Sequence, residues 1–252
     1  MKKLLLILLC LPLLFSCGGN KKENTLTREN LKGRVKELTE TSFNAKEAFG
    51  DLEKDGLVSE RKDKYDENGN GTERASYDKD GELDWKYKYQ YDENGNTTES
   101  AYYDKDGELE SKTKHQYDED GNKTEWASYD KDGELKSKTK SKYDEDGNET
   151  ESAYYNKDGE LNWKYKSKYD EDGNKTEWAS YRKDGELDWK YKFKYDEDGN
   201  TTEWASYDKD GESEWKRKYQ YDEFDKNNNW IVRTRYSDDT PKAIEEREIE
   251  YY

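Results

Sequence analysis

The chain has 252 residues, of which 42% are charged, and its formal net charge is −17 at pH 7. So acidic a surface repels nucleic acid and anionic lipid headgroups, which excludes both as expected partners. The charge and a hydrophobic content of only 29% would favour disorder, but 14% of the residues are aromatic and stand at regular positions, which favours a folded protein.

The first residues resemble a bacterial lipoprotein signal peptide, expected over residues 1–16. Lys2 and Lys3 form a positive start, an apolar stretch too short to span a bilayer follows, and the segment ends before Cys17. The resemblance implies a lipid on Cys17, so the expected partner is a membrane reached through this anchor.

The expected location is the outer membrane, at the cell surface or on the periplasmic face. An ordinary secretory signal with an incidental cysteine is the alternative. A polar tether is expected over residues 17–31.

A 26-residue repeat occupies more than half of the chain. Each copy contains a Tyr-Asp pair followed by a turn, and a second tyrosine series runs between these pairs at the same period. The tyrosines of the Tyr-Asp pairs are Tyr65, Tyr91, Tyr117, Tyr143, Tyr169, Tyr195 and Tyr221. A fixed repeat indicates a fold that grows by stacking similar units, not a globule built around one pocket.

One repeat is expected to form two antiparallel strands. Residues 82–91 alternate strictly between apolar and polar side chains, the pattern of a strand with two different faces. The turns at 92–95 and 104–107 both read Asp-x-(Asn/Asp)-Gly, which suits a type I turn with a G1 bulge. The shorter stretch between the turns is the second strand, so the repeats predict an antiparallel meander.

The register of this hairpin is a hypothesis. Counting outward from a three-residue loop places Tyr87 opposite Ala101 and Trp85 opposite Tyr103, all on one aromatic face. A slip of one residue would move every side chain of a strand to the other face. Two middle repeats replace the Trp and Tyr of that face by Ser and Thr, as at Ser137, so we expect a partly wetted face and not a sealed core.

The predicted fold is all-β: an antiparallel meander of roughly sixteen strands that is elongated, twisted or curled, and thin or single-layered. Residues 32–65 are expected to form an N-terminal capping hairpin, residues 66–221 the hairpin repeats, and residues 222–252 a C-terminal capping hairpin. The sequence leaves open whether the sheet is an open ribbon, a spiral or a partial shell.

The Tyr-Asp-x-x-Gly-Asn element, as at residues 91–96, resembles the YD repeat of the RHS family. The resemblance covers about residues 60 to 236. It implies a long β-sheet that curls, as in the large toxins whose YD repeats spiral into a shell. The chain departs from those toxins because it has too few strands to close such a shell and no effector domain after residue 236. It is most similar to short lipoproteins with YD-type repeats.

Little in the sequence indicates catalysis or a cofactor. The single histidine, His115, occupies a position that is Tyr89, Ser141 or Phe193 in other repeats, so we expect no enzyme and no cofactor. The acidic turns are weak calcium candidates because they match only part of an EF-hand loop. These candidates are Asp118, Asp120, Asp144 and Asp146.

The aromatic ladders suggest binding, because flat rings stack on sugar faces and repeats add avidity. The possible ligand-facing aromatics are Trp85, Tyr87, Tyr89, Trp163, Tyr165, Trp189, Tyr191 and Trp215. The ligand would be a glycan or a protein; alternatively the rings only hold a thin sheet together. The expected function is therefore a non-enzymatic, outer-membrane-anchored surface scaffold or adhesin-like binding module. The alternatives are a passive spacer or coat protein and a periplasmic inhibitor or immunity partner of a secreted toxin.

Overall fold

The computed structural model describes residues 24–252, so the expected signal peptide and the lipidation site at Cys17 lie outside the described residues. The described chain forms one short helix and sixteen strands. Their bounds are α1 (Thr25–Arg28), β1 (Val35–Ala48), β2 (Asp51–Tyr65), β3 (Gly71–Tyr77), β4 (Leu83–Tyr91), β5 (Thr97–Tyr103), β6 (Leu109–Tyr117), β7 (Lys123–Asp130), β8 (Leu135–Tyr143), β9 (Glu149–Asn156), β10 (Leu161–Tyr169), β11 (Lys175–Arg182), β12 (Leu187–Tyr195), β13 (Thr201–Asp208), β14 (Ser213–Phe224), β15 (Trp230–Ser237) and β16 (Thr240–Tyr251).

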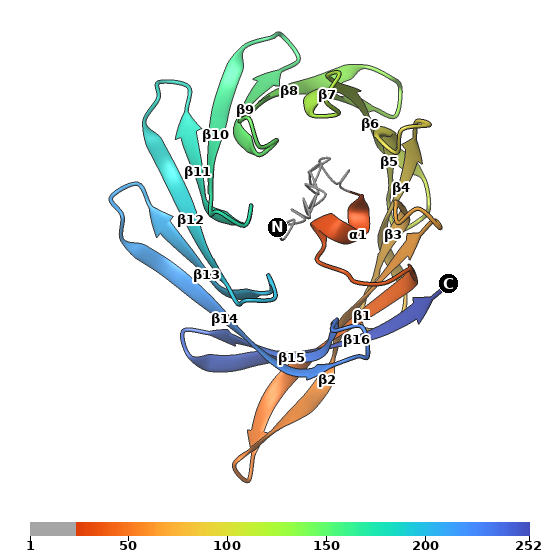
Figure 1. Ribbon diagram of the computed structural model, residues 1–252, viewed down its shortest axis with the longest axis vertical. Helices are drawn as coiled ribbons and strands as arrows, with labels where there is room; N and C mark the ends of the chain where they lie inside the picture. Colours follow the sequence, from red (N-terminus) through yellow and green to blue (C-terminus); the bar gives the residue numbers. More distant parts are fainter. Residues whose placement is uncertain (1–23) are drawn as a thin grey trace, which may run out of the picture.

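The strands form a closed barrel in which each strand pairs antiparallel with its sequence neighbours and β1 pairs with β16 (Figure 1). The predicted antiparallel meander of about sixteen strands is confirmed, but the expected open, elongated sheet is wrong. The two terminal hairpins are not free caps, because they pair with each other along a seam that includes Leu38 opposite Ile249 and Phe43 opposite Ile244. A barrel has no free sheet edge, so closure also removes the need for end caps.

Bulges at both turns of each repeat explain the closure and also correct the expected register. At one turn Tyr91 pairs with Thr97 while Gln90 pairs with Glu99, so the short strand contains one extra residue. Beyond this bulge Tyr87 lies opposite Tyr102, not opposite Ala101 as expected. Because bulges bend a strand and increase its twist, their repetition curls the sheet until its ends meet.

The two faces of the wall follow from this register. Helix α1 lies inside the ring (Figure 1), and a cavity beside it is lined by Tyr89, Ser100 and His115, so these side chains are on the inner face. Directly opposite residues share a face, which places the remaining Trp and Tyr of the long strands inside as well. Lys88 pairs with Ala101 on the outer face. The wall is therefore aromatic inside, and outside it has lysines on the long strands beside Glu, Ala and Tyr on the short strands.

A ladder of hydrogen bonds explains why a tyrosine recurs every 26 residues. The hydroxyl of Tyr143 donates to the backbone carbonyl oxygen of Lys123, twenty residues earlier, at 2.9 Å. Tyr91, Tyr117, Tyr169, Tyr195 and Tyr221 make the equivalent bond at 2.6 to 3.0 Å. Each bond joins one hairpin to the previous one at the same rim of the barrel. The Tyr-Asp tyrosine is therefore a structural residue of the wall.

The aspartate of the same pair organises the turn. Asp118 accepts the backbone N–H groups of Asp120 and Asn122 through one carboxylate oxygen, and the side-chain amide of Asn122 through the other. Gly121 has a φ of 85°, a conformation that favours glycine. These contacts account for the Asp-x-(Asn/Asp)-Gly-Asn pattern without any ligand.

The compact apolar core of the described chain lies under α1, at the rim that carries the Tyr-Asp turns. Leu26 and Leu31 pack against Val35, Leu38 and Tyr65 inside the barrel. Asn24 caps the helix and also donates from its side chain to the backbone oxygen of Asn68 at 2.7 Å. The end of the expected tether, from residue 24 onward, is therefore a docked element that partly fills one mouth of the barrel.

Candidate functional site

The inner wall of the barrel is the candidate site, and its side chains change in kind around the ring. Strands β9 to β14 present large rings, which we call the aromatic sector. Strands β6 to β8 present mainly Ser and Thr, such as Ser137 and Thr139, with Trp126 on β7. Strands β4 and β5 present a smaller set of rings. The wall near the seam holds what we call the charged sector. Its members are Glu29, Glu40, Arg61, Asp63, Arg74, Arg217, Arg233, Arg235, Glu245 and Arg247.

The aromatic sector consists of one stacked pair of rings and a larger set of linked ring contacts. Tyr154 stacks on Trp163 with centroids 4.0 Å apart and planes 5° from parallel. Trp178 meets Trp189 edge-on at 5.1 Å, and both also contact Tyr191. The contacts extend to Trp204, Trp215 and Phe193. Offset and edge-on pairs of this kind are the favourable arrangements for aromatic rings.

The structure places five of the eight predicted ligand-facing aromatics on the successive long strands β10, β12 and β14 of the sector, namely Trp163, Tyr165, Trp189, Tyr191 and Trp215. Trp85, Tyr87 and Tyr89 lie on β4, separated from them by the Ser and Thr of β6 to β8. The sequence reasoning missed four members of the sector: Tyr154, Trp178, Phe193 and Trp204. The register error concealed three of these, because it assigned Tyr154, Trp178 and Trp204 on the short strands to the opposite face.

Two polar groups of the aromatic sector have no acceptor. Within residues 24–252, the buried indole N–H groups of Trp163 and Trp204 lack a hydrogen-bond partner. A buried donor without a partner is unfavourable by about 1–3 kcal/mol and gains most from an incoming oxygen. The sector thus combines flat apolar rings with unused donors.

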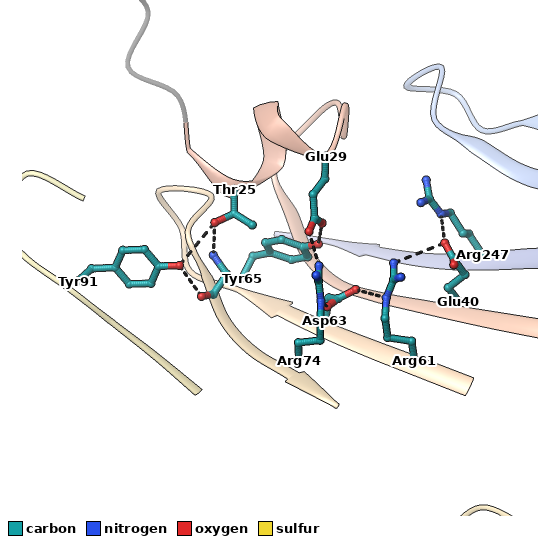
Figure 2. Close-up of polar contacts among 10 residues, drawn as sticks. Thr25, Glu29, Glu40, Arg61, Asp63, Tyr65, Arg74, Tyr91 and Arg247 are labelled. Atoms are coloured by element: carbon teal, nitrogen blue, oxygen red, sulfur yellow. Dashed lines mark hydrogen bonds and ion pairs between the residues drawn. The ribbon is translucent and has the colours of Figure 1, made fainter. Parts of the chain in front are cut away.

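The charged sector is a chain of alternating ion pairs (Figure 2). Glu40 accepts from Arg247 at 2.9 Å and lies 3.5 Å from Arg61, and Arg61 donates to Asp63 at 2.9 Å. Arg74 then bridges Asp63 and Glu29 of the segment that follows α1. These bonds join β16, β1, β2 and β3 and fasten the helical segment to the wall.

The electrostatics of this sector favour ionised carboxylates. Burial raises the pKa of Glu40, but the charges of Arg61 and Arg247 outweigh it and hold the pKa below its ordinary value. Beside this network a cavity of about 390 Å³ opens toward Arg217, Tyr219 and Arg235.

A second cavity, of about 250 Å³, lies beside α1 and is lined by Tyr91, Thr97 and Lys123 among others. The side chain of Thr25 accepts the backbone N–H of Gly71 at 3.0 Å there (Figure 2). Burial, with a smaller effect from Lys123, lowers the pKa of His115 to about 4, so this imidazole is neutral at pH 7.

The calcium candidates sit in separate turns. Asp144 accepts the backbone N–H groups of Asp146 and Asn148, and the Asn148 backbone bond is the largest effect that lowers its pKa. In the described part of the chain, no three His, Cys, Asp or Glu side chains form a group that could hold a metal ion. The carboxylates of Asp118 and Asp144 are used by their own turns.

The outer face of the barrel is charged. Lys112 and Lys138 form ion pairs with Glu99 and Glu125 on the short strands, at 2.8 and 3.3 Å. Ala127 is only 7% exposed because it lies between the lysines of both neighbouring strands, whose apolar stems cover it. Across residues 24–252 no helix has the length and apolar character needed to cross a membrane.

Comparison with known proteins gives a fold neighbour and no family. No protein-family model matches the sequence, and no match is found among curated proteins. A crystal structure described as a porin-like protein from Bacteroides uniformis superposes with a TM-score of 0.53 and 10% identity, covering 87% of this chain and 98% of that one.

Toxin structures also match, but only locally. The TcdB2-TccC3 complex covers 81% of this chain but 15% of its own, with a TM-score of 0.21 and 15% identity. The Photorhabdus luminescens Tc holotoxin pore covers 79% and 14%, with a TM-score of 0.20. TM-scores this low do not indicate that the two proteins share an overall fold. At these identities, the chain is shown to share a barrel fold with the porin-like protein, and the YD resemblance stays an expectation.

Proposed function

We propose that this protein is a non-enzymatic binding module, anchored to the outer membrane by a lipid on Cys17, that binds a glycan in the lumen of its barrel. The observation that carries the proposal is the aromatic sector, a surface of stacked and edge-on rings on the inner wall. Aromatic rings stack on the apolar faces of sugars, and unused indole N–H groups can donate to sugar hydroxyls.

The position of the rings supports a lumenal site. Barrels of sixteen strands are wide enough to leave an aqueous interior. Large rings are concentrated on β9 to β14, with a smaller set on β4 and β5, whereas β8 keeps the same fold with Ser137 and Thr139 at the equivalent places. The fold therefore does not require a ring at each of these positions.

The outer face supports a barrel that is anchored and not inserted. A bilayer-spanning barrel presents an outward apolar band flanked by aromatic girdles. Here the outward positions at mid-height include lysines paired with glutamates, such as Lys112 with Glu99 at 2.8 Å. A closed barrel with a porin-like neighbour is compatible with an outer-membrane protein, and a lipid anchor would hold such a water-facing barrel at that membrane.

Closure also makes a passive spacer less favourable. In an open ribbon an added repeat increases the length, but in a closed barrel an added hairpin increases the circumference. Copy number would therefore tune the width of the lumen, a property that matters for binding and not for spacing.

The test is saccharide binding to the full chain, solubilised in detergent and measured by calorimetry and tryptophan fluorescence. The double variant Trp163→Ser, Tyr165→Thr copies the residues that β8 already has at Ser137 and Thr139. It should therefore fold, while saccharide affinity falls about 10-fold or more. The matched control is Tyr129→Ser with Tyr155→Thr, which removes two rings from the outer face.

Equal affinity of the inner-wall variant and the original chain would contradict the proposal, as would the absence of binding to any saccharide. Location is tested separately by protease treatment of intact cells alongside a periplasmic control protein. Digestion of this protein while the control survives would assign it to the cell surface; protection would assign it to the periplasmic face.

A further inference from the structure

Arg217 is a charged inner-wall residue at a position that varies among the repeats. Four residues before the Tyr-Asp tyrosine, the five copies that end at Tyr91 to Tyr195 hold a tyrosine or a threonine, and the first copy, before Tyr65, holds Arg61. The equivalents are Tyr87, Thr113, Thr139, Tyr165 and Tyr191. Since the fold tolerates both a ring and a small hydroxyl at this position, it does not require the charge of a guanidinium.

Arg217 lies where the aromatic sector meets the charged sector. Its guanidinium carbon is 5.1 Å from the ring centroid of Trp204 and 4.8 Å from that of Trp215. It also lines the 390 Å³ cavity together with Arg61 and Arg235. A guanidinium stacked on rings keeps its N–H edges directed away from them, so it remains able to donate.

Within the described chain, Arg217 forms no direct ion pair, although Glu40 and Glu245 line the same cavity. Arg61, Arg233, Arg235 and Arg247 each form an ion pair with a carboxylate at 2.6 to 3.5 Å. Arg217 has no carboxylate within ion-pairing distance among residues 24–252. The charged sector contains six guanidinium groups against four carboxylates, an excess of 6 − 4 = 2 positive charges inside a chain whose net charge is −17.

We propose that the lumen selects acidic saccharides, with Arg217 as the specificity-determining residue that binds a sugar carboxylate. A sugar ring stacks on the part of the aromatic sector beside Arg217, and its carboxylate accepts the paired N–H groups of the guanidinium fork. The cavity is within the size range of small-ligand sites. This inference rests on the proposed glycan-binding function and names the class of glycan.

The experiment compares each acidic trisaccharide with its own methyl ester, which keeps the rings and removes the charge. An α-linked galacturonic acid trimer and a β-linked glucuronic acid trimer are titrated into the full chain in detergent. The variants are Arg217→Tyr, which is the residue of the equivalent positions 165 and 191, and Arg217→Lys, which keeps the charge but not the fork. Circular dichroism verifies that each variant is folded.

For at least one trimer, the acid should bind the original chain roughly 10- to 100-fold more tightly than its ester. Arg217→Tyr should lose that preference, so that its affinities for acid and ester lie within about 3-fold of each other, and Arg217→Lys should keep only part of the preference. Salt should weaken the binding of the acid more than that of the ester.

Equal binding of acid and ester to the original chain would overturn this inference and leave the glycan-binding function in place. A preference that survives in Arg217→Tyr would also overturn it, because another cation would then be responsible. If neither acid nor ester binds while another saccharide binds in the calorimetric test of the proposed function, only this inference fails; if no saccharide binds at all, both fail.

Discussion

The repeat-built wall and the seam of the barrel are held together in different ways. In β4 to β13, successive hairpins are joined through the Tyr-to-carbonyl ladder inside and Lys–Glu pairs outside. At the seam, β16 meets β1 through buried charges that no repeat contains, such as Glu40 with Arg247, 207 residues away. The repeats therefore set the curvature of the wall, and the seam joins the two ends of the chain.

The largest effect should come from breaking the seam. Glu40→Ala removes the carboxylate between Arg61 and Arg247 and leaves two buried guanidinium groups without it. Loss of one partner from a buried pair costs about 3–5 kcal/mol. We expect the free energy of unfolding, measured by urea denaturation, to fall by that amount.

The matched control is Glu99→Ala, which removes a carboxylate from an exposed pair with Lys112. Exposed pairs contribute about 0–1 kcal/mol, so this change should be small. Equal effects of the two substitutions would contradict the distinction between seam and wall.

Acid should weaken the seam as well. Because the pKa of Glu40 in the folded chain is below its ordinary value, the folded state favours the ionised carboxylate. That stability is fully present above the ordinary Glu pKa of about 4.3 and is lost as pH falls through the folded pKa. The free energy of unfolding should therefore decrease from pH 5 to pH 3, and Glu40→Gln should show a shallower decrease. If Glu40→Gln left the pH dependence of the free energy of unfolding unchanged, protonation of Glu40 would not be the cause of the acid sensitivity.

The same contrast explains how much of the fold could be predicted from the sequence. Hairpins and turns depend on local patterns, so the meander of about sixteen strands was predicted from one repeat. Closure of the barrel depends on the curvature that many bulges add together and on ion pairs between residues far apart in the chain, such as Glu40 and Arg247. A local sequence pattern does not reveal either feature. The end hairpins were for that reason expected as separate caps.

The candidate site was predicted in part for a related reason. The Trp and Tyr of the long strands were recognised because they alternate with lysines, and the structure gathers those of β10, β12 and β14. The bulge contains one extra residue on the short strand: Thr97 pairs with Tyr91 and Glu99 pairs with Gln90, so Thr98 has no paired residue on the long strand of this hairpin. From this bulge onward, each side chain of the short strand lies on the face opposite to the expected one. Trp178 and Trp204 were therefore placed on the wrong face, and with them the extent of the aromatic sector.

An intermediate effect should come from the tyrosine ladder of the repeat wall. Tyr143→Phe keeps the ring and removes the hydrogen bond to the carbonyl of Lys123. Burial raises the pKa of Tyr143 to about 12, so its hydroxyl is a donor at all working pH values. We expect a loss of about 1–2 kcal/mol in the free energy of unfolding. Tyr129→Phe, on the outer face, is the control and should change it by less than about 0.5 kcal/mol.

The smallest effect should come from the outer face, and it tests whether that face meets water. Lys138 is paired with Glu125 at 3.3 Å, but 43% of its side chain is exposed. Lys138→Gln keeps most of the apolar stem that covers Ala127, so the free energy of unfolding should change by less than about 0.5 kcal/mol. The measured change should also be nearly independent of salt concentration. A loss above about 2 kcal/mol would indicate that this face is buried against another surface, and the barrel could then not be a water-facing module held only by its anchor.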